Sequence, residues 1–166
     1  MAITRLGGAT AITGTIPQGN IANASLGAVT TLPSAIATGR VLQVVTATDT
    51  TQRSTTSTSY VTASNTLSLA ITPSSSSNKV FIVVNSEVYG INSVGNFTIY
   101  RGGTNVATAS GITESRLDWG TLSMSYLDSP STTSATTYQV YFKTNGVITY
   151  LNNGNTGSIT AFEIAG

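Results

Sequence analysis

The stretch Leu67-Ser-Leu-Ala-Ile-Thr-Pro-Ser-Ser-Ser-Ser-Asn-Lys-Val-Phe-Ile-Val-Val84 decides the fold class of this chain. Residues 67–71 alternate apolar with small residues, which is the period-two pattern of a β-strand that buries one face. Pro73 and the serines after it end this strand in a turn. After Lys79, residues 80–84 are apolar at successive positions, so we expect a second strand at residues 79–84 that is covered on both faces.

Short strands of the same kind recur along the rest of the chain. Alternating or β-branched runs bounded by Gly, Asn and Pro predict further strands at residues 41–45, 97–100, 105–108, 121–126, 138–143, 147–151 and 158–164. Gly102 and Gly103 predict a hairpin, because both positions accept positive φ. About ten short strands without a convincing helix indicate an all-β fold, an antiparallel β-sandwich.

The aromatic residues mark a boundary in the chain, since all of them lie between Tyr60 and Phe162. Residues 1–39 carry only small or aliphatic side chains, spaced irregularly between glycines and two prolines. That spacing fits neither helical nor strand periodicity. We therefore expect an extended N-terminal anchoring arm at residues 1–39 and a β-sandwich domain at residues 40–166.

Two interpretations of the arm compete: a disordered tail, or a strap that becomes ordered by pressing aliphatic side chains into grooves on other subunits. Disordered tails are typically highly charged and poor in aliphatic residues, and this segment is the opposite, so we favour the strap. Fully extended, about 39 residues could span roughly 130 Å. The expected anchors to neighbouring subunits are Ile3, Leu6, Ile12, Ile16, Ile21, Leu26, Val29, Leu32 and Ile36.

Composition excludes many kinds of chemistry. Charged residues make up 8% of the 166 residues, against about 25% in an ordinary soluble domain. There is no Cys and no His, which removes disulfides, thiolate nucleophiles, Cys/His zinc sites and Ser-His mechanisms. We expect no enzyme activity, no cofactor and no metal.

Charge and hydropathy bear on partners and location. The net charge is +1 and the basic residues are scattered, which argues against nucleic-acid binding, because that binding depends on neutralising phosphates. No apolar run approaches the roughly 18 residues that cross a bilayer, so we expect no membrane association. The first residues do not resemble a signal peptide, which indicates a soluble product of the cytoplasm.

Two sequence features could still carry chemistry. Glu114 and Asp118 stand four residues apart with Arg116 between them, and a pair of carboxylates in a cleft would suit an enzyme that degrades envelope polysaccharide. We favour a local salt bridge of Arg116 with one of these carboxylates. Residues 152–155, Asn-Asn-Gly-Asn, could offer carbonyl oxygens to a cation, but we favour a turn because no carboxylate is nearby.

Trp119 is the only tryptophan in the chain. Three interpretations stay open for it: a platform on which a carbohydrate stacks, a contact at a subunit interface, or burial in its own domain. We group Trp119 with Tyr126 and Tyr150 as candidate subunit-interface or ligand contacts.

Several stretches follow one another in order along residues 39–165. They are Gly39-Arg-Val-Leu-Gln-Val-Val45, Thr55-Thr-Ser-Thr-Ser-Tyr-Val61, Leu69-Ala-Ile-Thr-Pro-Ser-Ser-Ser-Ser-Asn-Lys-Val-Phe-Ile82, Ile99-Tyr-Arg-Gly-Gly103, Ser125-Tyr-Leu-Asp-Ser-Pro130, Ala135-Thr-Thr-Tyr138 and Ile159-Thr-Ala-Phe-Glu-Ile164. Together they resemble the C-terminal β-domain of bacteriophage virion appendage proteins, and residues 15–26 resemble the anchoring regions of such proteins. The resemblance implies a jelly-roll-like homotrimer, mounted on a virion that is assembled in the host cytoplasm.

The short segment before the domain separates two functions. Fibre proteins of this type commonly carry a long shaft, whereas fewer than 40 residues precede this domain. We therefore expect a trimeric capsid decoration (cement) protein, whose arm clamps neighbouring subunits of the major capsid protein or another virion protein. The alternative is a tail-fibre or spike subunit that binds a host glycan as a receptor.

Overall fold

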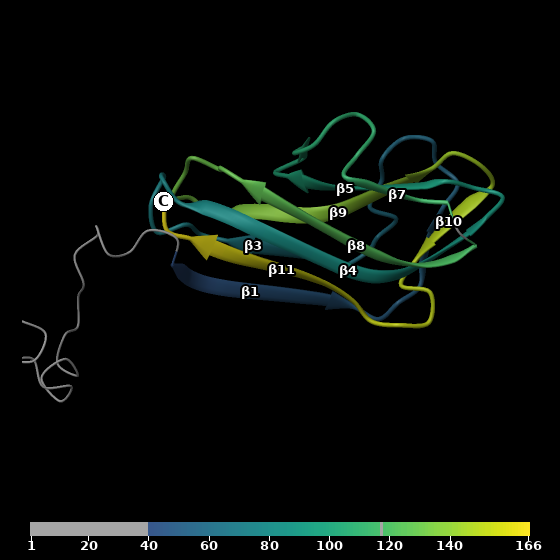
Figure 1. Cartoon of the computed structure of the whole chain (residues 1–166), viewed down its shortest axis with the longest axis horizontal. Coiled ribbons are helices and arrows are strands. Elements are labelled where there is room, and N and C mark those ends of the chain that lie inside the picture. The colour runs from purple at the N-terminus through teal and green to yellow at the C-terminus, as the bar shows by residue number, and fades with distance from the viewer. Residues whose placement is uncertain (1–39, 117) are drawn as a thin grey trace, which may run out of the picture. The chain divides into compact units, whose positions relative to one another are not determined.

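The structure is a computed structural model that describes residues 40–116 and 118–166, and these residues form an antiparallel β-sandwich without a helix (Figure 1). The strands are β1 (Val41–Asp49), β2 (Arg53–Thr55), β3 (Ser68–Ile71), β4 (Lys79–Ile91), β5 (Gly95–Arg101), β6 (Thr104–Asn105), β7 (Thr113–Ser115), β8 (Trp119–Asp128), β9 (Thr136–Thr144), β10 (Ile148–Leu151) and β11 (Gly157–Ile164). The expected fold class is therefore confirmed. Residues 1–39, where the arm was expected, lie outside the described residues.

The strands pair as a set of nested hairpins. β1 pairs with β11, β3 with β9, β4 with β8, and β5 with both β6 and β7. Two more pairings, β11 with β4 and β9 with β5, sort these hairpins into the layers β1-β11-β4-β8 and β3-β9-β5-β6, which Figure 1 shows one above the other. This connectivity is that of a jelly roll, which the resemblance had implied.

The core lies between the two layers and follows the alternation seen in the sequence. In the first sheet, Val80, Ile82 and Val84 of β4 point inward and are fully buried. In the second sheet, Tyr138 and Phe142 of β9 do the same. Because burying a large apolar side chain stabilises the fold by about 1.5–3 kcal/mol, these inward rows hold the sheets together.

The outer face of β4 differs from the sequence prediction. An apolar run on both faces predicted cover on both sides, and that prediction is wrong for the described residues. The second sheet covers only the face of Val80 and Ile82, while Phe81 and Val83 on the opposite face are half-buried. The chain thus carries apolar side chains on a sheet face that its own described residues leave partly open.

The predicted hairpin at Gly102 and Gly103 is confirmed. Both glycines have positive φ, 53° and 88°, and Arg101 pairs with Thr104 across the turn. The strand that follows is shorter than predicted, since β6 has two residues. The Asn105 side chain accepts a hydrogen bond from its neighbour's backbone, Ala107 N, at 3.0 Å, and such local bonds compete with strand pairing.

A buried polar cluster joins the two sheets at one end. The carboxylate of Asp128 on β8 accepts two hydrogen bonds from Arg101 Nη1 on β5, at 2.9 and 2.8 Å, and one from the Tyr138 hydroxyl on β9, at 2.6 Å. Burial and the bond to Asp128 raise the pKa of Tyr138 far above its usual value. The phenol therefore stays a protonated donor at every physiological pH.

A second buried carboxylate fixes the turn between β3 and β4. Glu163 on β11 accepts hydrogen bonds from Asn78 Nδ2 at 2.6 Å, from Gln43 Nε2 at 2.7 Å, and from the backbone and hydroxyl of Ser74 at 2.6 and 2.8 Å. Burial alone would raise the pKa of Glu163, but these bonds outweigh it and hold the pKa below its ordinary 4.5. The first strand, the turn and the last strand are thus tied to one charge.

Asp128→Ala should destabilise the sandwich by about 3 kcal/mol, because it leaves a buried phenol and a partly buried guanidinium without their acceptor. Tyr138→Phe should cost about 1.5 kcal/mol, since Asp128 keeps its bonds from Arg101. Urea unfolding followed by circular dichroism measures both. The control Glu114→Ala removes an exposed ion pair with Arg116 and should change the unfolding free energy by less than about 0.5 kcal/mol; a loss as large as that of Asp128→Ala would contradict the assignment.

The sandwich should lose stability in acid partly through Glu163. A carboxyl group whose pKa is lower in the folded state stabilises the fold fully above its unfolded pKa, here 4.5, and that contribution disappears as the pH falls through the folded value. Glu163→Gln should lower the melting temperature at neutral pH, because the amide nitrogen would face hydrogen-bond donors. The decline of the melting temperature in acid should become flatter, because the amide does not titrate. Thermal melts from about pH 3 to about pH 7 test this, and an unchanged pH dependence in the variant would refute it.

Candidate functional site

A row of aromatic side chains crosses the outer face of the first sheet. Tyr89 on β4 lies opposite Trp119 on β8 and opposite Tyr150 on β10. The ring centroid of Tyr89 lies 4.8 Å from the ring centroid of Trp119 and 5.6 Å from that of Tyr150. We call these three residues the aromatic row.

Strand alternation places this row outside the core. Val88 and Leu151, the neighbours of Tyr89 and Tyr150, are buried, so the two tyrosines point to the opposite face. Trp119 is 58% exposed, which rules out burial in its own domain. Tyr126, grouped with it from the sequence, packs against the core instead and does not join the row.

A shallow hollow of about 560 Å³ lies beside Trp119, within the size range of small-ligand sites. It lies at the point along β4 where the paired strand changes from β11 to β10. β11 pairs with β4 as far as Asn85, and β10 pairs with β4 from Val88 onward. The connecting segment between β10 and β11 borders the gap. The hollow is lined by Asn85, Ser86, Glu87, Trp119, Gly120, Thr121, Asn155 and Thr156.

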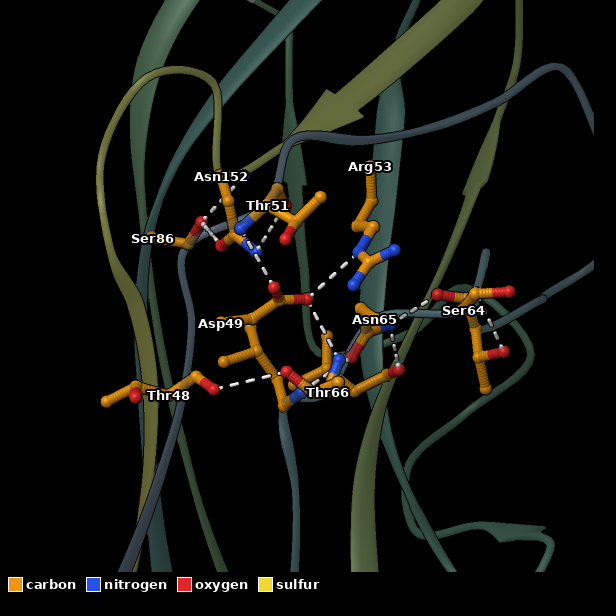
Figure 2. Close-up of polar contacts among 12 residues, drawn as sticks. Thr48, Asp49, Thr51, Arg53, Ser64, Asn65, Thr66, Ser86 and Asn152 are labelled. Atoms are coloured by element: carbon orange, nitrogen blue, oxygen red, sulfur yellow. Dashed lines mark hydrogen bonds and ion pairs between the residues drawn. The ribbon is translucent and has the colours of Figure 1, made fainter.

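The segment that borders the hollow is held by buried polar contacts (Figure 2). Asn152 has a positive φ of 57° and is buried. Its side chain accepts a hydrogen bond from Ser86 Oγ at 2.8 Å and donates one to Thr51 O at 3.3 Å. This arrangement is the loop that the sequence predicted for residues 152–155, and it fixes the wall of the hollow against β4.

Asp49, at the end of β1, supports the same region (Figure 2). Its buried carboxylate accepts hydrogen bonds from the backbone of Thr51 and Thr66, both at 2.9 Å, and from Arg53 Nε at 3.1 Å. Burial raises the pKa of Asp49, but these bonds outweigh it and lower the pKa below its usual value. Asp49 therefore stays charged at neutral pH and holds Thr51, the partner of Asn152, in place.

Glu87 is the only charged residue in the described part of the chain that lines the hollow. The Glu87 carboxylate accepts a hydrogen bond from Asn155 Nδ2. The backbone carbonyl of Glu87 accepts one from Asn152 N at 2.9 Å. The hollow thus presents a carboxylate, amides and a hydroxyl beside an exposed indole, a set that can donate and accept hydrogen bonds.

A second cluster lies at the other end of the same face. Val44, Phe162, Phe81 and Leu127 stand opposite one another across β1, β11, β4 and β8. Val44 is 54% exposed and Leu127 is 51% exposed, and the rings of Phe81 and Phe162 are 6.3 Å apart. We call these four residues the apolar row. Phe81 and Tyr89 are eight positions apart on β4, so the two rows are separated by about 26 Å.

The carboxylates singled out from the sequence do not form a pair. Glu114 is bonded to Arg116 Nε at 2.7 Å with both side chains exposed, which confirms the predicted local salt bridge. Glu114 and Arg116 line a small hollow of about 270 Å³, and Asp118 lines neither it nor the hollow beside Trp119. The structure does not bring Glu114 and Asp118 into one cleft.

Other sites were sought in the described part of the chain. Residues 40–116 and 118–166 contain no cluster of three or more Asp, Glu, His or Cys side chains suited to a metal ion. Within the same residues, no helix has the length and apolar character needed to cross a bilayer. The nine aliphatic anchors expected between Ile3 and Ile36 lie outside the described residues.

Sequence reasoning missed Tyr89, Glu87 and Asn85 as members of the site, and it singled out Asn155 only as part of a turn. We ended the predicted strand at residue 84, whereas β4 runs to Ile91. The alternation of Glu87, Val88 and Tyr89 could have extended the strand and placed Tyr89 on the face of Phe81. No local signal could have brought Asn155 to Glu87.

Comparisons with known proteins add no identification. The chain matches no protein-family model and no curated protein.

Proposed function

We propose that this chain is a structural protein of a bacteriophage virion, a homotrimeric capsid decoration protein whose residues 1–39 fasten it to neighbouring capsid subunits. The apolar row is the observation that carries this proposal. The placement on a phage particle and the number of copies rest on the resemblance described above.

The apolar row has the properties of a subunit interface. It is continuous across four strands and is flanked at the same end of the sheet by further exposed apolar side chains, Val41 at 49% and Leu42 at 38%. Contiguous exposed apolar surface on a soluble protein marks an interaction site. The run of residues 79–84, apolar on both faces, is then explained if a neighbouring subunit supplies the cover that the described residues lack.

The position of the arm's attachment supports the same proposal. Ala165 N donates a hydrogen bond to Arg40 O at 2.9 Å, and Val41 pairs with Ile164. Residues 1–39 therefore join the sandwich at the end that carries the apolar row. Contacts made there by the sandwich and by three arms would act together, since linked binding sites raise one another's effective concentration.

A second candidate function has its own observation in favour. The aromatic row and the adjoining hollow suit a receptor-binding module of a tail fibre or spike, because exposed aromatic side chains beside polar groups are typical of recognition sites. Under this function the sandwich would display the hollow to a glycan of the host surface.

The full chain should behave in solution as a trimer, with three times the 17.0 kDa mass of one chain. The double variant Val44→Ser with Leu127→Ser replaces both ends of the apolar row. It should shift the protein toward monomers, because the interface would lose apolar contact area. Both residues are more than half exposed, so the core of the sandwich is untouched. Light scattering coupled to size exclusion measures the mass. Trp119→Ser, on the same face, is the matched control and should stay trimeric; a trimeric Val44/Leu127 double variant would overturn the interface.

Binding to particles should depend on residues 1–39. The chain should sediment with purified virions in numbers comparable to the major capsid protein, as gel densitometry would show, whereas a tail fibre would be far less abundant.

Deleting residues 2–38 should leave a folded protein that no longer binds to virions from which the wild-type chain is missing, because the aliphatic anchors are gone. Unchanged particle binding by the deletion variant would refute the fastening role.

A further inference from the structure

We infer that the hollow beside Trp119 binds an uncharged sugar residue of a polysaccharide, with the sugar ring stacked on the indole and its hydroxyls bonded to Glu87, Asn155 and Asn85. This inference rests on the second candidate function and adds the site and the class of ligand. It does not depend on whether the apolar row is a subunit interface.

Trp119 provides a platform that is both accessible and fixed. The side chain is 58% exposed, yet its ring packs on Tyr89 at 4.8 Å, and Tyr89 is supported in turn by Tyr150 at 5.6 Å. The electron-rich face of an aromatic ring attracts polarised C–H groups, and one face of a pyranose ring consists of such groups. A supported indole needs little ordering when a sugar binds, so less entropy is lost.

The polar lining complements sugar hydroxyls. Each hydroxyl both donates and accepts, and the hollow offers an acceptor-only carboxylate at Glu87 and amides that do both at Asn85 and Asn155. Asn155 donates to the Glu87 carboxylate, which holds the acceptor at the wall. The loop carrying Asn155 is itself fixed through Asn152 and Ser86.

Charge sets the class of sugar. Among residues 40–116 and 118–166, no Lys or Arg lines the hollow, and Glu87 gives it a negative charge, so uronic, sialic or phosphorylated sugars would be repelled. A second copy of the chain is a poorer occupant, because Asn85, Glu87 and Asn155 line the hollow with polar groups and the apolar row on the same face offers a better contact. A neutral sugar matches both the indole and the hydrogen-bonding groups.

The test uses the full chain and a panel of neutral oligosaccharides (glucose, galactose, mannose and N-acetylglucosamine tetramers), with galacturonic acid tetramer as the anionic comparison. Trp119 is the sole tryptophan, so its fluorescence reports binding at the site. We expect at least one neutral tetramer to shift the emission saturably, with a Kd on the order of 0.1–1 mM because the hollow is shallow, and we expect no response to the acid.

Isothermal titration of variants then assigns the residues. Trp119→Ala and Glu87→Gln should each weaken binding by at least about tenfold, with unchanged circular dichroism. Val147→Ala, which alters another side chain that is 58% exposed but lies outside both the hollow and the apolar row, is the matched control and should bind as the wild type does. Binding that survives both site variants, or no binding of any neutral tetramer, would overturn the inference.

Incorporation of the same variants into virions distinguishes failure of the sugar site from failure of the capsid decoration role. If Trp119→Ala assembles normally and the wild-type chain binds no sugar, the sugar site is wrong and the decoration role stands. If the chain is absent from purified virions while sugar binding is lost in Trp119→Ala, the sugar site stands and the decoration role is wrong. If Trp119→Ala instead changes the oligomeric mass and no sugar binds, the aromatic row is a contact between copies of the chain and the inference is overturned.

Discussion

Hydrogen bonding along both edges of β4 is the constraint on which the described domain depends. β8 pairs with nearly its whole length on one side, while β11 and then β10 share the other side. Because one strand sets the register of three others, the side chains of β4 fix which residues of the neighbouring strands share a face. The aromatic row and the apolar row both exist because Tyr89 and Phe81 occupy the same face of this strand.

The change of partner along β4 has a structural cost and shapes the surface of the first sheet. Where β11 gives way to β10, the sheet cannot continue smoothly, and the connecting loop must turn beside β4. Asn152 adopts a positive φ there, and its polar groups are satisfied by Ser86 and Thr51, as buried polar groups require. The resulting gap in the sheet surface is the hollow, so the site is a by-product of how the strands are joined.

Much of the fold could be predicted from the sequence, because period-two alternation is a local signal. The strand at residues 138–143 was predicted correctly for that reason, and the turn at Gly102 and Gly103 was predicted correctly from residue type. The extent of β4 was missed, because residues 85–91 mix polar and apolar side chains on both faces and only Glu87, Val88 and Tyr89 alternate clearly. β2 and β7 are too short to leave a pattern. The site was only half predictable: Trp119 and Tyr150 stand out by residue type, but Tyr126 has the same type and faces the core. Which of them meet depends on pairing between distant strands, and composition does not encode that.

The nested hairpins also govern how the protein can be made. Gln43 on the first strand and Glu163 on the last are bonded although they stand 120 positions apart in the sequence. A ribosome delivers β1 early, at about 5–20 residues per second, and β1 must wait several seconds for its partner strand. During synthesis its exposed edge and Val44 have nothing to pair with, so an emerging chain is vulnerable to association with its neighbours on the same messenger. The first sheet can therefore close only after β11 has been synthesised, as expected for a topology dominated by long-range pairings.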